Sequence, residues 1–359
     1  MFLENAWYAV MWSEGLEDGQ LIPRTVLGRP LVLFRRESGE IAAISDLCPH
    51  KFVPLHKGKL LPGDRVQCGY HGIEIHADGD CVRNPHGNER IPPNCKVRSY
   101  PVRDKHTVLW VWMGTDAPDE SQIPDYSFMD HGAGYEVTRR DFLRINANYR
   151  MVADNLMDLS HSPFLHDGVI GGPDTIKADI QVEQDGTSVK VHRPKQNVRP
   201  PGLLDRVYKQ DGERVDIWST IQWRAPCYIL NDTGAYPPGG TREQGSGVLG
   251  AHLLTPETES TTLYHFSAAR TGVVHDPTED QEAFRQWLSD ARRHAFERQD
   301  EPMIEAQERM REQYPEATRR PMLFEIDAGP ARCNRILNEL IRDESARLTA
   351  SPDESRSDK

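Results

Sequence analysis

The order of hydrophobic and polar positions divides the chain into a strand-rich first part and a mixed second part. Between residues 5 and 113, short apolar runs such as "LVLFRR", "IAAIS", "KVRSYPV" and "VLWVWM" are separated by Gly, Pro and Asp turns. Runs of this length and spacing predict a small, mostly antiparallel β domain. The next stretch, "GTDAPDESQIPDYSFMDHGAG" at 114–134, is acidic, rich in Pro and Gly and lacks periodicity. It therefore predicts a linker.

The second part shows helical and strand patterns in turn. Residues 148–161 place apolar side chains at the i, i+3, i+7, i+10 spacing of a helix with one buried face: Tyr149, Val152, Leu156 and Leu159. Further runs predict strands in "VDIWSTIQW", "VLGAHLLTPE" and "TTLYHFSAAR", and helices over 277–313 and 329–347. The expected fold class is α+β. We expect four segments: a β domain at 1–115, a linker at 116–135, an α+β domain at 136–347 and a disordered tail at 348–359.

Charge and composition exclude several classes of function. The 359 residues include 43 basic and 55 acidic side chains, a formal net charge of −12, which disfavours binding to nucleic acid. No run of eighteen apolar residues is present and the first thirty residues lack a signal-peptide pattern, so we expect a cytoplasmic protein without membrane association. Six cysteines, four of them within 48–95, are too few and too clustered for a secreted disulfide framework. Their clustering indicates metal ligation.

The clustered cysteines form a spaced motif with histidines. Cys48-x-His50 is followed, after seventeen residues, by Cys68-x-x-His71. A structural zinc site also accepts two Cys and two His, but zinc-finger sequences usually offer paired Cys and then paired His. In a Rieske [2Fe–2S] centre, two Cys hold one iron and two His hold the other. Because each loop here offers one Cys and one His, the order favours a Rieske centre over zinc.

A second group of potential ligands lies at the end of the first predicted helix. In "DNLMDLSHSPFLH", His161 follows Asp158 by three residues and His166 follows His161 by five. On an unbroken helix the two histidines would diverge by about 140°, since each residue turns about 100°. Pro163 disfavours helix at Ser162, so we expect the chain to break there and to bring His166 back toward His161. Two histidines and one carboxylate form the facial triad that binds Fe(II) and leaves positions open for O₂.

With these residues the chain resembles the Rieske non-haem iron oxygenases. Their first module has Cys-x-His and Cys-x-x-His at this separation, and their second has Asn-x-x-Asp-x-x-His followed by x4-His. The second pattern is matched by Asn155, Asp158, His161 and His166. In this family the carboxylate ligand lies on a C-terminal helix, for which "FERQDEPMIEAQERM" is the matching stretch. The resemblance favours Asp300 as that ligand, with Glu301, Glu297 and Asp290 as competitors.

The resemblance is most specific to the group that includes vanillate O-demethylase and dicamba O-demethylase, and it extends from "NAWYAV" to "FEIDAG". In the dicamba enzyme an Asn, a His and a Trp hold the carboxylate of the substrate. The corresponding residues here are Asn231, His252 and Trp287. Two features depart from the group's pattern. Lys51, Phe52 and Val53 replace the usual Arg-Gly-Ala, and the spacing from Trp287 to Asp300 is longer.

The resemblance implies a Rieske domain of antiparallel strands and a helix-grip-like catalytic domain, in which helices pack on an antiparallel sheet. It also implies an aromatic monooxygenase with a [2Fe–2S] cluster and a mononuclear Fe(II), supplied with electrons from NAD(P)H by a separate ferredoxin-type flavin reductase. We expect O- or N-demethylation of a methoxy-aromatic acid with release of formaldehyde. Ring-methyl hydroxylation and ring cis-dihydroxylation are the nearest alternatives. An electron carrier without catalytic iron is the alternative of a different class.

The resemblance further implies a homotrimer in which the cluster of one subunit serves the iron of its neighbour. His71 of one chain would then face Asp158 of the next, and the Asp158 carboxylate would hold His161. Asn155 is a further candidate catalytic residue. Residues 46–106 contain ten basic and seven acidic side chains, so this stretch is +3 in a chain of −12. It is a candidate docking surface for an acidic reductase.

Overall fold

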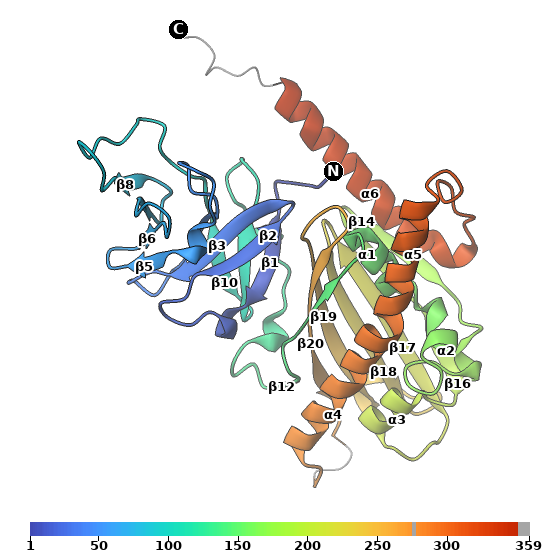
Figure 1. Ribbon diagram of the computed structural model, residues 1–359. Coiled ribbons are helices and arrows are strands. Elements are labelled where there is room, and N and C mark those ends of the chain that lie inside the picture. The colour runs from blue at the N-terminus through green and yellow to red at the C-terminus, as the bar shows by residue number, and fades with distance from the viewer. Residues whose placement is uncertain (275–277, 351–359) are drawn as a thin grey trace. The chain divides into compact units, whose positions relative to one another are not determined.

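The computed structural model describes residues 1–274 and 278–350, which form two compact units. The first unit comprises residues 5–125 and 255–259, and the second comprises residues 1–4, 126–254 and the described residues from 260 onward. Figure 1 shows the first unit mainly in blue to teal and the second mainly in green to red.

The first unit consists of short antiparallel strands, as its β-branched and aromatic runs predict. These strands are β1 (Trp7–Trp12), β2 (Ile22–Val26), β3 (Arg29–Arg35), β4 (Ile41–Ser45), β5 (Lys59–Leu61), β6 (Arg65–Gln67), β7 (Glu74–His76), β8 (Cys81–Arg83), β9 (Ser99–Tyr100), β10 (Val102–Lys105) and β11 (Val108–Trp112). They form three sheets with the orders β1-β11-β10, β2-β3-β4-β9 and β5-β6-β7-β8. The first cysteine motif follows β4 of the second sheet, and the second motif lies in the loop between β6 and β7 of the third sheet.

A short piece from far along the chain completes the first unit. Residues 255–259 belong to it, although the sequence-based division assigned them to the second domain. The Thr255 hydroxyl donates to the Ala9 carbonyl at 2.6 Å, and the Leu27 N–H donates to the Pro256 carbonyl at 2.8 Å. Long-range hydrogen bonds of this kind leave no local pattern, so a division by composition could not find them.

The segment predicted to be a linker, 116–135, is folded rather than extended. It contains two 3₁₀ helices, Glu120–Gln122 and Ser127–Met129. Four of its apolar side chains are at most 7% exposed: Ile123, Tyr126, Phe128 and Met129. The Tyr126 hydroxyl donates to the Ile229 carbonyl at 3.2 Å. Single buried residues in a Pro- and Gly-rich stretch have no periodicity, which explains why the sequence indicated only a linker.

The second unit is built around one large antiparallel sheet. Its strands are β12 (Glu136–Val137), β13 (Asp141–Ile145), β14 (Gln181–Asp185), β15 (Ser188–His192), β16 (Lys195–Val198), β17 (Val215–Arg224), β18 (Tyr228–Tyr236), β19 (Ser246–Pro256) and β20 (Thr262–Gly272). The order is β12-β20-β19-β18-β17-β15-β14, with β13 paired to β20 and β16 paired to β17. β17 alternates buried and less buried residues along much of its length, whereas β19 and β20 are buried at nearly every position.

Helices pack on this sheet and position the candidate ligands. They are α1 (Tyr149–Met157), α2 (Ser162–Leu165), α3 (Gly202–Tyr208), α4 (Gln281–His294), α5 (Glu301–Gln313) and α6 (Ala328–Ala350). A π-helix, Ala295–Asp300, joins α4 to α5 in one long element that crosses the sheet in Figure 1. Phe284 and Leu288 of α4 are buried in a core with Ile217 of β17 and Val248 of β19.

These helices agree with the sequence pattern over most of their length. The helix predicted over 277–313 is present from residue 281, while residue 277 lies outside the described residues. Asp280 caps its start by accepting from the backbone N–H groups of Glu282 and Ala283. α6 extends to Ala350, so the first residues of the predicted disordered tail are helical. The rest of that tail, 351–359, lies outside the described residues.

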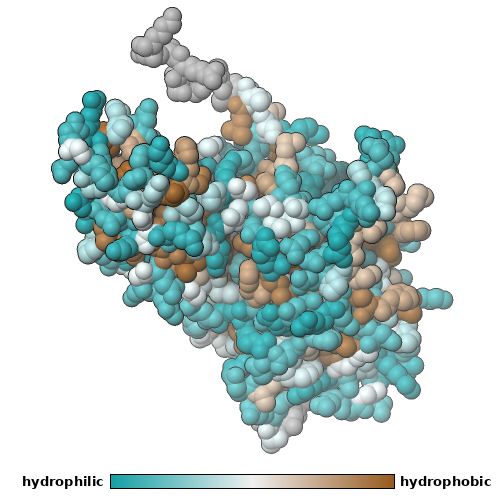
Figure 2. Space-filling model, in the orientation of Figure 1, coloured by the Kyte–Doolittle hydropathy of each residue, from teal (hydrophilic) through white to brown (hydrophobic). Residues whose placement is uncertain are grey.

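Within residues 1–274 and 278–350, no helix is both long enough and apolar enough to cross a membrane. The face shown in Figure 2 is mostly hydrophilic with small apolar patches, in keeping with the 43 basic and 55 acidic side chains.

Candidate functional site

Two loops of the first unit present the cysteine motifs with the same backbone geometry. The N–H of Cys48 donates to the carbonyl five residues on, and its carbonyl accepts from the N–H four residues on, at 3.0 and 2.8 Å. Cys68 makes the same two bonds at 2.8 and 2.9 Å. The residue four positions after each cysteine has a positive φ, 58° at Phe52 and 68° at Gly72. The loops are therefore equivalent, although only one has the glycine that this φ favours.

The motif side chains form a cysteine pair and a histidine pair. Cys48 and Cys68 are 1% and 2% exposed, and burial together with the neighbouring thiol raises the pKa of Cys48. The rings of His50 and His71 lie 4.6 Å apart between centroids and are less buried. In the described part of the chain, no three of these four donors lie within 4.8 Å of one another, as a single tetrahedral zinc would require. A cluster with two irons, one held by each pair, fits this donor set.

In the second unit, the chain breaks just before the two histidines of the other motif. α1 ends at Met157, and Asp158 adopts an extended backbone with φ −104° and ψ 98°. Ser162 is helical, and Pro163 lies in the first turn of α2, where no N–H donor is needed. The sequence-based explanation was wrong on this point, because the break lies at Asp158 and not at Ser162. Its consequence, that His166 returns toward His161, is nevertheless what the structure shows.

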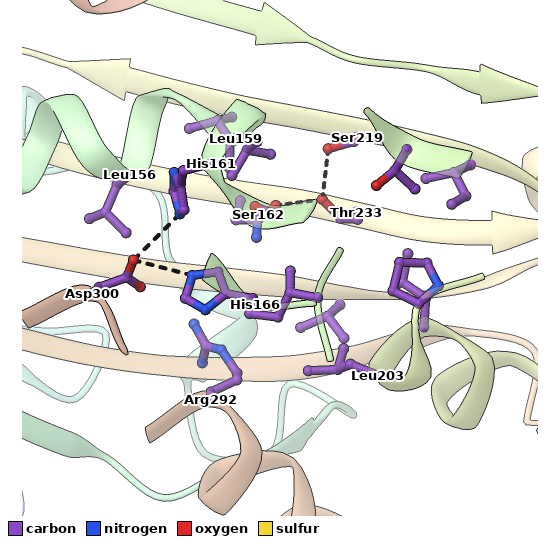
Figure 3. A pocket seen from close by; sticks show the side chains of 18 of the residues that line it. Leu156, Leu159, His161, Ser162, His166, Leu203, Ser219, Thr233, Arg292 and Asp300 are labelled. Carbon is purple, nitrogen blue, oxygen red and sulfur yellow. Dashed lines mark hydrogen bonds and ion pairs between the residues drawn. The ribbon is translucent and has the colours of Figure 1, made fainter. Parts of the chain in front are cut away.

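His161, His166 and Asp300 converge on one point. Their donor atoms all lie within 4.8 Å, and Asp300 Oδ1 is 3.4 Å from His161 Nε2 and 3.2 Å from His166 Nε2 (Figure 3). His161 Nδ1 donates to the main-chain carbonyl of Asp158 at 2.5 Å, and His166 Nδ1 donates to Gln299 Oε1 at 2.8 Å. Because both acceptors fix the proton on Nδ1, both Nε2 lone pairs are available to a metal.

Asp300 is suited to be the carboxylate of this group. It is 5% exposed, and although burial raises its pKa, the contacts with His161 and His166 hold the pKa at about 2. The side chain is therefore ionised at neutral pH. The three competing carboxylates have other neighbours: Glu297 binds Arg293, Asp290 binds Arg139, and Glu301 lies near Glu305.

Asn155 and Asp158 lie beside the triad in different ways. Asn155 Nδ2 donates to Asp300 Oδ1 at 3.0 Å and so restrains the rotation of that carboxylate. The Asp158 carboxylate does not hold His161 within the chain, contrary to expectation. It accepts from the Ser160 N–H at 2.8 Å and caps the 3₁₀ turn Leu159–His161, while the Asp158 main-chain carbonyl binds the imidazole.

The triad opens into a cavity of about 110 Å³ between the sheet and the helices. Most of its wall is apolar, with Leu156, Leu159, Ile217, Ile221, Val248 and Phe296 among the lining residues. Two of the three predicted substrate residues also line it, Asn231 from β18 and His252 from β19. A mainly apolar cavity with a few convergent polar groups is typical of a small-molecule site.

The third predicted substrate residue, Trp287, does not line this cavity. Its ring stacks on the Arg206 guanidinium, 4.1 Å from the ring centroid, and borders a surface groove that includes Gly168. The residue that α4 presents to the cavity is Arg292, five positions later and so about 140° around an α-helix from Trp287. The sequence-based placement of Trp287 is therefore corrected.

Sequence reasoning missed two residues of this site. Gln299 binds His166 and directly precedes Asp300, so its position beside a candidate ligand was a usable signal. Arg292 lines the cavity, but nothing distinguished it in the sequence from the exposed arginines of the same helix.

A cluster-binding β unit joined to a unit with a two-histidine, one-carboxylate centre defines a Rieske-type oxygenase. Comparison with known proteins agrees. Residues 6–101 match the Rieske [2Fe–2S] domain, and residues 145–343 match the vanillate O-demethylase oxygenase C-terminal domain. The chain is 34% identical to the oxygenase component of chloroacetanilide N-alkylformylase from Rhizorhabdus wittichii, over 96% of this chain and 97% of that one. It is 33% identical to the iron-sulfur subunit of a toluene-4-sulfonate monooxygenase system from Comamonas testosteroni, over 96% and 99%.

Solved structures show the same relationship. The crystal structure of dicamba monooxygenase bound to 3,6-dichlorosalicylic acid is similar with a TM-score of 0.88 and 32% identity, over 96% of this chain and 99% of that one. Another dicamba monooxygenase structure, which contains non-heme iron and dicamba, has a TM-score of 0.78 at 32% identity, over 97% and 99%. The chain belongs to the Rieske oxygenases of the vanillate O-demethylase oxygenase family. The expected family, the α+β fold class and the assignment as an oxidoreductase are confirmed.

Proposed function

We propose that the chain is the oxygenase component of a multicomponent monooxygenase that demethylates a methoxy- or N-methyl-aromatic acid. The observation that supports this proposal best is the convergence of His161, His166 and Asp300 at a mainly apolar cavity. An electron carrier fused to a binding domain would have no use for such a donor set.

The proposed cofactors are a [2Fe–2S] cluster held by Cys48, His50, Cys68 and His71, and a mononuclear Fe(II) held by His161, His166 and Asp300. When bound, the cluster supplies electrons and the iron activates O₂, so that one oxygen atom enters a substrate C–H bond and the other leaves as water. An oxygenated methoxy group is a hemiacetal, which releases formaldehyde and leaves the phenol.

The chain's own residues prepare the site for this chemistry. The Asp158 carbonyl and Gln299 fix the orientation and tautomer of the two imidazoles, and Asn155 restrains the Asp300 carboxylate. The apolar wall excludes water from the reacting methyl group and leaves polar contacts to Asn231 and His252. Both of these residues are proposed to contact the substrate.

Electrons would come from NAD(P)H through a ferredoxin-type flavin reductase, and the oxygenase would be a homotrimer. The candidate docking charges in the 46–106 stretch are Arg83, Arg90, Lys96, Arg98, Arg103 and Lys105. Three of them have intramolecular partners: Arg83 pairs with Glu74, Arg103 pairs with Glu120, and Arg98 donates to the Met113 carbonyl. Arg90 and Lys96 are exposed, and we propose them as the docking charges of this surface.

Metal analysis and turnover test the proposal together. The purified protein should contain about three Fe and two acid-labile sulfides per chain, whereas an electron carrier would contain about two Fe. Asp300→Asn should lose one Fe and all turnover while keeping the cluster absorbance. Asp290→Asn, which removes an exposed carboxylate of the same long helix, is the matched control and should keep both.

A panel of methoxybenzoates, N-methylanilines and toluene-4-sulfonate, assayed with a surrogate reductase, distinguishes the possible reactions. Demethylation produces formaldehyde in a one-to-one ratio with NADH consumed. Ring-methyl hydroxylation, which the relative that oxidises toluene-4-sulfonate keeps open, produces a benzyl alcohol and no formaldehyde. A cis-diol product would indicate ring cis-dihydroxylation and would refute the monooxygenase proposal.

A further inference from the structure

Arg292 is a buried cation without a hydrogen-bonding partner at its outer nitrogen. The side chain is 6% exposed, and its Nη2 atom finds no acceptor among the described residues. Its guanidinium carbon lies 5.8 Å from the Phe266 ring and 5.4 Å from the Phe296 ring, so its immediate neighbours are largely aromatic. Buried polar groups are nearly always paired in folded proteins. An unpaired guanidinium at a cavity wall therefore indicates a ligand that supplies the acceptor.

The direction of the side chain places this acceptor inside the cavity. Arg292 is one of the cavity-lining residues, and Figure 3 shows its guanidinium pointing toward the side where His166 and Asp300 lie. The adjacent Arg293 points elsewhere and pairs with Asp141 at 3.1 Å. Two consecutive arginines of α4 thus have different roles: one pairs with a buried carboxylate and the other lines the cavity.

Three polar residues lie around Gly250. It lies opposite Asn231 in the β18–β19 pairing. A Cβ placed on Gly250 would be 3.0 Å from Arg292 Nη2, 3.3 Å from His252 Nε2 and 3.5 Å from Asn231 Cβ. The two nitrogen atoms therefore approach the same glycine, and an added side chain would displace them. Because Arg292 and His252 both line the cavity, one carboxylate or sulfonate group there can accept from both nitrogen atoms.

The Asp141 carboxylate, which does not line the cavity, acts on the charge of Arg292 without a hydrogen bond to Nη2. Burial and the charge of Arg292 lower the pKa of His252 far below its usual range, so this imidazole is neutral. Burial raises the pKa of Tyr264, whose hydroxyl lies 2.6 Å from His252 Nδ1 and can donate to it. That tautomer places a proton on His252 Nε2. Asp300 is the one carboxylate that lines the cavity in the described residues, and it belongs to the proposed iron site.

We propose that Arg292 Nη2, together with His252 Nε2, binds the anionic group of the aromatic substrate, a carboxylate or a sulfonate, at the cavity wall beside Gly250. The inference rests on the proposed function and adds Arg292 to the residues that recognise the acid. Arg292 then determines specificity, because a neutral amide in the same place would leave the buried charge unpaired. Lys195 is the other cation that lines the cavity, and it is not among the atoms nearest to Gly250.

Binding of matched neutral and anionic ligands tests this subsite without turnover. Isothermal titration of the iron- and cluster-loaded protein would compare 3-methoxybenzoate with 3-methoxybenzamide, and toluene-4-sulfonate with toluene-4-sulfonamide. We expect the wild type to prefer the anion of at least one pair by roughly ten- to hundredfold, the strength of a charge-assisted hydrogen bond in a buried site. The pair with the larger preference identifies the acid as a carboxylate or a sulfonate.

Variants assign the preference to Arg292. Arg292→Met should abolish it by weakening the anion alone, and Arg292→Lys should retain part of it. Gly250→Ala should also weaken the anion, although every charge is kept, because the added methyl group occupies the space beside Nη2. This second variant keeps the test valid if Arg292→Met does not fold. Lys195→Met is the matched control and should leave the preference unchanged.

Three results would overturn the proposal: equal binding of amide and acid by the wild type, an unchanged preference in Arg292→Met, or a preference lost in Lys195→Met instead. The same measurements distinguish a failure of the anion subsite from a failure of the proposed function. If neutral substrates are demethylated as efficiently as acids, the anion subsite fails and the demethylase proposal stands. If the acids bind as expected but no methyl group is ever oxidised, the subsite stands and the demethylase proposal fails.

Discussion

The hydrogen bond from His166 Nδ1 to Gln299 provides a sensitive test of the metal centre. His166 is 2% exposed, and the Gln299 oxygen, 2.8 Å away, is the acceptor that fixes its tautomer. Gln299→Leu removes the acceptor and keeps a side chain of similar size. The imidazole must then either leave a buried Nδ1–H unsatisfied or move the proton to Nε2, the atom required for the metal.

Both outcomes weaken metal binding. A buried donor without a partner costs about 1–3 kcal/mol. Loss of an outer hydrogen-bond partner of a ligating histidine typically lowers metal affinity by about 10–100-fold, equivalent to about 1.4–2.7 kcal/mol. The metal-free protein should lose less stability than the metal-bound one, because in the metal-free form Nε2–H can donate to Asp300, 3.2 Å away. Gln299→Glu keeps an acceptor and should bind iron nearly as well as the wild type.

The assay is anaerobic competition for Fe(II) between the protein and a chromogenic chelator, with cluster absorbance recorded as a check on folding. Gln286→Leu makes the same replacement on the exposed side of α4, where Gln286 binds Asp290, and is the matched control. If Gln299→Leu retained wild-type affinity while its cluster content was intact, Gln299 would not orient His166 and the proposed ligand geometry would be incorrect.

Three further predictions follow from other parts of the chain. Burial raises the pKa of Asp154 to about 7. The stability associated with its protonated form is therefore present below about pH 4 and is lost as the pH rises through 7. In urea unfolding, Asp154→Asn should be up to about 4 kcal/mol more stable than the wild type at pH 8 and equal to it at pH 4. Phe52 has φ 58°, so Phe52→Gly should exceed Phe52→Ala in stability by about 1 kcal/mol, and equal melting temperatures would argue against the strain. If the proposed trimer passes electrons between subunits, co-expression of His71→Ala and Asp300→Ala chains, each inactive alone, should restore roughly a quarter of wild-type activity. The reason is that about three quarters of the trimers are mixed and each mixed trimer has one functional pair of cluster and iron out of three. Demonstrably mixed trimers without activity would exclude electron transfer between subunits.

The cluster motif could be predicted from the sequence because its geometry is local. Each Cys and its His lie in one loop, and hydrogen bonds that span only four or five residues hold that loop. The order of Cys and His along the chain was therefore sufficient to favour two equivalent loops over a zinc finger. The positive φ at Phe52 was not predictable, since a bulky residue there contradicts the usual preference for glycine.

Only part of the iron centre could be predicted from the sequence. His161 and His166 are near in sequence, but the break that brings them together depends on Asp158, whose side chain favours a cap over a continued helix. Asp300 is 134 residues from His166, and no local pattern relates two residues that far apart. Its selection from four acidic residues depended on the resemblance to a family, and the structure shows why the other three lie elsewhere: their partners are surface arginines or another glutamate.

The misplacement of Trp287 has a specific cause in the long helix. The resemblance placed Trp287 in the pocket although its spacing to Asp300 is longer than the pattern of the group. If α4 continued unchanged to Asp300 at about 100° per residue, Arg292, eight positions before Asp300, would lie about 80° away from it. The chain instead forms a π-helix over Ala295–Asp300, in which the Glu301 N–H bonds to the carbonyl of Phe296, five residues back. A π turn takes up about one more residue than an α turn, so eight residues come close to two full turns. Arg292 and Asp300 are thereby brought onto the same face, and Trp287 is rotated away from it. Pro302 is the second residue after this segment and has no N–H to give to the Arg298 carbonyl, so an α-helical continuation would lose a hydrogen bond there in any case. The sequence contains this proline, but not the tertiary contacts of Asp300 with His161 and His166 that make the wider turn favourable.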